Sequence, residues 1–155
     1  MGLVLYKPKL AELTFRQELL ADPETMAYNH AYGGCISFGK ERWLDWYARW
    51  MHEPDHFYRY LYDPQRQCCV GEVAWHYDME MDKYMLNVIV KASERNRGYG
   101  RAGLALLCQA AKEAGLRVVY DLLASDNPSL HLFLDSGFTI VETVLDEGIL
   151  VQKRL

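Results

Sequence analysis

The residues with the clearest chemical potential form an arginine- and glycine-rich turn, Arg95-Asn-Arg-Gly-Tyr-Gly-Arg101. Gly98 and Gly100 carry no side chains, so the backbone can approach a ligand closely there. If a helix starts at this turn, its first N–H groups have no acceptor within the helix and lie at the positive end of the helix dipole. Such a helix start binds anions, phosphate groups above all. The turn therefore predicts a phosphate-binding site.

The sequence on either side of the turn has the pattern of a strand and a helix. Apolar residues dominate 84–90 before the turn, and after it Leu104, Leu107, Cys108 and Ala111 recur at helical spacing. The dinucleotide-binding fingerprint fits poorly, because it needs a third glycine and an acidic residue about 20 positions further on. A Walker loop is excluded because no Gly-Lys-Ser/Thr is present.

In this context the turn resembles the acyl-coenzyme A loop of the GNAT superfamily of N-acetyltransferases, whose pattern is Gln/Arg-x-x-Gly-x-Gly/Ala. Arg95, Gly98 and Gly100 match its fixed positions. A second block, from Asn127 to Gly137-Phe138, resembles the asparagine and short helix ending in Gly-Phe of the same family. The resemblance implies an N-acetyltransferase that moves the acetyl group of acetyl-coenzyme A to a primary amine in a ternary complex.

The resemblance also implies roles for individual residues. The backbone of the strand before the turn would hold the pantetheine arm, through Val88, Ile89 and Val90. Asn127 would touch the same arm, although Asp126-Asn-Pro128 is also a natural helix start. The pyrophosphate would be bound by main-chain N–H groups and by guanidinium groups of the turn, from Arg95, Arg97, Gly98, Tyr99, Gly100 and Arg101.

One position departs from the family pattern. Many members carry a tyrosine four residues before the glycine of Gly-Phe, where its hydroxyl can protonate the departing thiolate, but this chain has Phe133. Another group or water would then supply the proton, or the thiolate would leave unassisted, because a thiol pKa of about 8.5 makes it a fair leaving group. The alternative is a non-catalytic module that binds or senses acyl-coenzyme A.

Attack on a thioester needs a neutral amine, so a base must take up a proton. Glu72, on the strand predicted at 69–77, is our first choice, and Asp82, just before the next strand, is the second. The competing interpretation of Glu72 is a salt-bridged or solvent-facing strand residue.

The segment Tyr28-Asn-His-Ala-Tyr32 is expected to be an aromatic loop on the acceptor side of the site. Tyr28, His30 and Tyr32 could enclose a cation by cation–π contact, at roughly 0.5–2 kcal/mol each. If Glu72, Asp78 or Glu80 also lines the pocket, the charge favours a small cationic acceptor such as a polyamine or an aminoglycoside. A protein N-terminus or lysine is the alternative acceptor.

Periodicity predicts the elements that position these residues. Strands are expected at 3–6, 57–62, 69–77, 84–90, 117–123, 138–145 and 148–152. Helices are expected before Asp22, at 40–52, after the turn, and at 127–136. The order resembles the GNAT fold, an α/β arrangement with a central mixed, mostly antiparallel sheet of about seven strands flanked by about four helices.

Length and composition set the remaining limits. A chain of 155 residues, half of them hydrophobic and a quarter charged, predicts a single globular domain over 1–155. The net charge of −4 argues against nonspecific nucleic-acid binding. With no export signal or membrane-spanning run, we expect a cytoplasmic protein that needs no membrane partner. The four cysteines lack Cys-x-x-Cys spacing, so no metal site is expected. A homodimer is left open.

Overall fold

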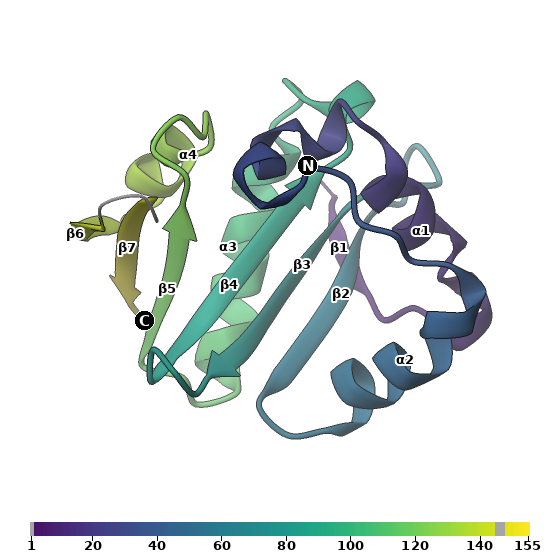
Figure 1. Cartoon of the computed structure of the whole chain (residues 1–155), viewed down its shortest axis with the longest axis horizontal. Coiled ribbons are helices and arrows are strands. Elements are labelled where there is room, and N and C mark those ends of the chain that lie inside the picture. Colours follow the sequence, from purple (N-terminus) through teal and green to yellow (C-terminus); the bar gives the residue numbers. More distant parts are fainter. Residues whose placement is uncertain (1, 145–147) are drawn as a thin grey trace.

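The computed structural model describes residues 2–144 and 148–155, and in it seven strands form one sheet in the order β1-β2-β3-β4-β5-β7-β6 (Figure 1). Neighbouring strands are antiparallel except for β4 and β5, which are parallel. The strands are β1 Val4–Tyr6, β2 His56–Asp63, β3 Cys68–Asp78, β4 Lys83–Val90, β5 Val118–Leu123, β6 Thr139–Val144 and β7 Gly148–Arg154. The predicted mixed, mostly antiparallel sheet is confirmed. The predicted end of the sixth strand, residue 145, lies outside the described residues.

Helices cover both faces of the sheet, with α1 and α2 on one face and α3 on the other (Figure 1). The α-helices are α1 Thr14–Ala21, α2 Trp43–His52, α3 Tyr99–Glu113 and α4 Leu130–Asp135. Short 3-10 helices join them: η1 Leu10–Glu12, η2 Thr25–Tyr32, η3 Lys40–Arg42 and η4 Ala92–Glu94. The predicted order of strands and α-helices is confirmed.

We expected the aromatic segment 28–32 to be a loop, but it forms the C-terminal part of the 3-10 helix η2. Gly33 ends this 3-10 helix in the left-handed conformation, with φ of 101°, and its N–H bonds the carbonyl of His30. Glycine adopts this conformation without a steric cost, so Gly33 and Gly34 end the helix, and the chain continues without helical structure. The aromatic side chains are therefore held on a helical turn.

Alternation along β4 places successive side chains in two different cores. Val88 and Val90 pack on the face that α3 covers, together with Leu104 and Leu107. Ile89 packs on the opposite face, against residues of α1, η2 and α2. The strand is therefore fixed by apolar contacts on both faces, while its edge towards β5 stays available.

The sheet opens between β4 and β5. Within the described residues, a single residue pair, Met85 with Tyr120, joins the two strands. Beyond it the strands diverge towards their carboxyl ends (Figure 1). Backbone groups on the β5 side of β4 are left without a strand partner there, and a ligand with amide groups can bond them.

Candidate active site

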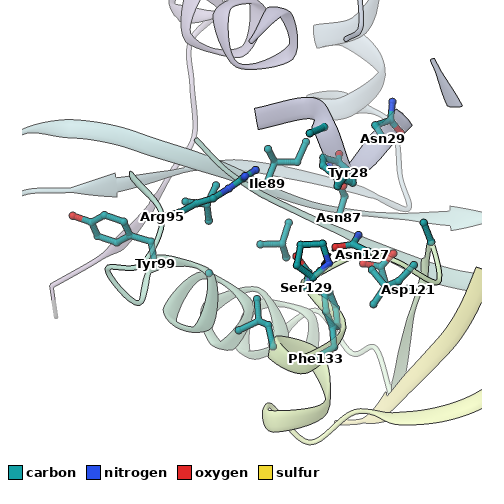
Figure 2. A pocket seen from close by; sticks show the side chains of 18 of the residues that line it. Tyr28, Asn29, Asn87, Ile89, Arg95, Tyr99, Asp121, Asn127, Ser129 and Phe133 are labelled. Atoms are coloured by element: carbon teal, nitrogen blue, oxygen red, sulfur yellow. Dashed lines mark hydrogen bonds between the residues drawn. The ribbon is translucent and has the colours of Figure 1, made fainter. Parts of the chain in front are cut away.

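A cleft of about 780 Å³ lies where β4 and β5 diverge. Its walls come from η2, the end of β4, the start of α3, the end of β5 and α4 (Figure 2). The volume is within the range of about 300–1,000 Å³ that is typical of small-molecule sites. One cleft thus joins the phosphate-binding turn to the aromatic helix η2.

The phosphate end of the cleft is built by the start of α3. Gly98 has a φ of 83°, and the first α-helical hydrogen bond runs from the N–H of Ala102 to the Gly98 carbonyl, at 3.1 Å. The N–H groups of Tyr99, Gly100 and Arg101 precede that bond, so they are available to an anion. A Cβ on Gly100 would lie 3.1 Å from Leu132 Cδ2, so a larger residue would crowd the cleft.

The side chains of the turn are largely engaged elsewhere. The Arg95 guanidinium donates to the Thr25 carbonyl at 3.0 Å, and the Tyr99 hydroxyl donates to Asp63 at 2.6 Å. Arg97 lies 3.7 Å from Glu94 and does not line the cleft, whereas the exposed Arg101 does. The groups of this turn that remain available to an anion are therefore mainly its backbone N–H groups, and phosphate binding here, including a contact by Arg97, stays a prediction.

The residues predicted to hold the pantetheine arm are in place around the cleft. Val88, Ile89 and Val90 line it along β4, and Asn127 lines it from the other side (Figure 2). The Asn127 side chain also accepts a hydrogen bond from the Ser129 N–H at 2.8 Å, which shapes the turn into α4. Asn127 thus combines the helix-start arrangement with a position on the cleft wall.

The predicted acceptor residues Tyr28, His30 and Tyr32 also line the cleft, from η2. Burial raises the pKa of Tyr28 above its ordinary value, and the negative charges of Glu72 and Asp121 raise it further, so its hydroxyl is neutral. His30 Nε2 lies 2.9 Å from an Asp126 carboxylate oxygen, which links η2 to the segment after β5.

Neither predicted base lines the cleft. Glu72 is completely buried, and both its oxygens accept hydrogen bonds from Arg16 Nη1, at 2.6 and 2.7 Å. Asp82 is exposed in the turn between β3 and β4 and accepts a hydrogen bond from the Tyr77 hydroxyl. Strand β4 separates Asp82 from the phosphate turn, a length of about 25 Å at about 3.3 Å per residue. This geometry favours neither residue as the proton acceptor.

Several polar residues of the cleft were missed by sequence reasoning, among them the strand residues Asn87 and Asp121. Asp121 is the acid in Val-Val-Tyr-Asp-Leu-Leu123, an otherwise apolar strand, and burial raises its pKa well above the ordinary value. Asn87 similarly interrupts the apolar run of β4. A polar residue inside an apolar strand was the signal that would have pointed to both.

The described part of the chain lacks two features, a cluster of metal-ligating side chains and a membrane-spanning helix. It contains no group of three or more His, Cys, Asp or Glu side chains that could hold a metal ion. Over the same residues, no helix combines the length and the apolar character needed to cross a membrane.

Comparison with known proteins agrees with the geometry of the cleft. Residues 16–138 match the model of the acetyltransferase (GNAT) family. None of the curated protein sequences matches significantly. Among solved structures, the spermidine N-acetyltransferase of Vibrio cholerae in complex with CoA and spermine is 17% identical with a TM-score of 0.82, over 98% of this chain and 95% of that one. The PaiA N-acetyltransferase of Thermoplasma acidophilum in complex with coenzyme A is 15% identical with a TM-score of 0.75, over 100% of both chains.

The family match spans most of the chain, from α1 to the end of the Gly137-Phe138 block. It includes the phosphate turn, the diverging strands β4 and β5, and η2. The chain therefore belongs to the GNAT family and is an N-acetyltransferase whose acetyl donor is acetyl-coenzyme A.

Proposed function

We propose that the chain acetylates a primary amine of a small cationic molecule by direct attack on acetyl-coenzyme A in a ternary complex. The observation that carries this proposal is the distribution of groups in one cleft. Phosphate-binding backbone lies at one end, while aromatic rings and a carboxyl group gather at the other, from Tyr28, His30, Tyr32 and Asp126. Aromatic faces attract cations, and carboxylates pair with ammonium groups.

The geometry supports a division of labour for this reaction. The N–H groups at the start of α3 hold the phosphates, and the backbone of Val88 to Val90 orients the thioester along the free edge of β4. The amine enters beside η2 and attacks the carbonyl carbon, so that a C–N bond forms and the C–S bond breaks. The spermine bound by the Vibrio cholerae spermidine N-acetyltransferase, a protein of the same fold, supports an acceptor of this class.

Mass-spectrometric detection of acetylated products tests the proposal. Purified protein is incubated with acetyl-coenzyme A and a panel of polyamines, aminoglycosides, amino acids and short peptides, with the Gly98→Asp variant as the matched control. We expect acetylation of a polyamine or aminoglycoside by the wild type and none by the variant. Acetylation confined to the peptides, or none at all, would overturn the small cationic acceptor.

A further inference from the structure

Asp121 stands at the point where the sheet opens. It directly follows Tyr120, the β5 residue that pairs with Met85 of β4, and it lines the cleft. Its neighbours at alternate positions, Val119 and Leu123, pack in the same core as Phe133. Strand alternation therefore directs the carboxyl to the face of the sheet on which Phe133 lies (Figure 2).

No ion pair within the described residues ties the carboxyl of Asp121 to the rest of the fold. Across residues 2–144 and 148–155 it forms no ion pair, and the polar group that favours its ionised form is the N–H of Leu122. The two other carboxylates of the cleft are engaged, Glu94 with Arg66 and Asp126 with His30. An acid that is partly shielded from water and has no cation beside it is costly, and such groups gather at functional sites.

The reacting atoms of the proposed reaction come to the same place. Phosphates held at the start of α3 would place the donor along β4 from Val90 towards Asn87, in the direction of the Met85–Tyr120 pair at which the opening closes. Its thioester end therefore points to the closed end of the opening, where Asp121 lies. Phe133, beside it, has no proton to exchange.

We propose that Asp121 is the proton-transfer residue of the reaction: its carboxylate takes the proton that the attacking amine loses and returns it to the sulfur. This inference rests on the proposed function. The amine gives up one proton as the C–N bond forms, and the C–S bonding pair leaves on sulfur as a thiolate. The proton passes from nitrogen to the carboxylate and then to the thiolate, so the products are an amide and a thiol, and Asp121 is regenerated.

Few other titratable groups face Asp121. Tyr28 of η2 lines the same cleft, and the pKa of Tyr28 is raised mainly by burial and partly by the charge of Asp121. The segment after β5 contributes Asp126, paired with His30, while β4 presents Asn87 and α4 presents Leu132 and Phe133. A carboxyl whose pKa burial raises is suited to exchange protons near neutral pH.

The test is steady-state kinetics of Asp121→Asn against pH, with acetyl-coenzyme A and spermidine, or the best acceptor of the panel. Asn keeps the shape but cannot carry the proton. We expect kcat to fall by about 10²–10⁴-fold, with KM for acetyl-coenzyme A unchanged within about threefold. The wild-type fall in kcat at low pH that reflects protonation of Asp121 should disappear in the variant. Asp45→Asn, an exposed site on α2, is the matched control and should behave as the wild type.

The outcomes separate this inference from the proposed function. Wild-type turnover together with an undiminished kcat in Asp121→Asn would overturn the inference alone. A raised KM for the amine with kcat retained would also overturn it, because Asp121 would then anchor the ammonium group. No wild-type turnover with any amine would overturn the proposed function and the inference with it. A thermal melt of each variant checks that the fold is intact.

Discussion

Glu72 and Asp121 are two acids of the same sheet, the first completely buried and the second partly exposed, with opposite surroundings. Glu72 faces Arg16, whose guanidinium also lies 4.5 Å from the centre of the Trp46 ring and 4.9 Å from that of Phe38. Asp121 has no cation beside it and faces the cleft. A charge that is already paired is poorly placed to accept a proton, whereas an unpaired one in a cleft is available. Burial alone therefore does not identify a catalytic acid.

At Glu72 we predict a loss of stability rather than a loss of chemistry. Glu72→Gln leaves the buried Arg16 without its counter-charge, which should lower the free energy of unfolding by about 3 kcal/mol. Urea denaturation measures this loss, with Glu18→Gln, an exposed site on α1, as the control. Coenzyme A affinity should be kept. A Glu72→Gln protein of wild-type stability without turnover would make Glu72 a catalytic residue after all.

The anion site predicted at the start of α3 depends on the whole helix, because the free N–H groups and the helix dipole act together. Gly98→Asp places a negative charge at this start, while Asn and Asp both tolerate the left-handed conformation that Gly98 adopts. Like charges a few ångströms apart repel by about 1–4 kcal/mol. We therefore expect Gly98→Asp to bind coenzyme A about tenfold or more weakly than Gly98→Asn, measured by calorimetry. Equal affinities of the two variants would contradict the prediction that the phosphates bind at this turn.

The 3-10 helix η2 is tied to the phosphate-binding half of the molecule through Thr25. The buried Thr25 hydroxyl accepts a hydrogen bond from the Ala92 N–H at 2.9 Å and donates to Asp22 at 2.5 Å. Arg95 adds its bond to the Thr25 carbonyl. These contacts fix η2 relative to the turn at the start of α3.

Thr25→Val tests this link with little change of shape. The Ala92 N–H loses its acceptor, so we expect the free energy of unfolding to fall by about 1–3 kcal/mol in urea titrations. Thr25→Ser, which keeps the hydroxyl, should lose less. If Val and Ser destabilise equally, packing of the methyl group rather than the hydrogen bond holds η2.

For the whole molecule, stability against pH combines two opposite contributions. Hydrogen bonds lower the pKa of four carboxyl groups. The chief donor is the Lys9 backbone for Glu12, Thr25 for Asp22, Tyr99 for Asp63 and Arg66 for Glu94. Their stabilisation is present above the unfolded pKa of about 4 and is lost as the pH falls. Asp121 has a raised pKa, so its contribution is present below about pH 4 and is lost as the pH rises through its folded pKa.

Asp121→Asn removes the second contribution and leaves the first. We therefore expect the variant to gain stability over the wild type as the pH rises from about 4 to 8, and the difference to level off below about 4. Urea midpoints over this pH range measure it. A difference that stays constant with pH would show that Asp121 titrates alike in the folded and unfolded chain.

The exposed edge of the whole sheet bears on assembly. Ile140 and Val141 of the edge strand β6 are 50% and 45% exposed. Edge strands of this kind can pair with a second chain, but a homodimer stays a prediction.

The sequence by itself determined the elements and the turn between β4 and α3 that is predicted to bind phosphates. The apolar run of β4, the turn at Gly98 and the helical face of α3 are local patterns, because each depends on residues a few positions apart. The residues predicted to bind coenzyme A therefore line the cleft, with Arg97 as the exception. Tyr28, His30 and Tyr32 also line the cleft, although their 3-10 helix was expected to be a loop, and their contact with the acceptor stays a prediction.

Only the tertiary structure decided which acid faces the cleft. Glu72 is neutralised by Arg16, 56 positions away in the chain, and no local pattern reveals such a partner. Asp82 lies at the wrong end of β4, and Asp121 meets the cleft because β5 parts from β4 just beyond Tyr120. The charge and reactivity of a side chain depend on neighbours that the fold brings together, so they could be read only after the strands were paired.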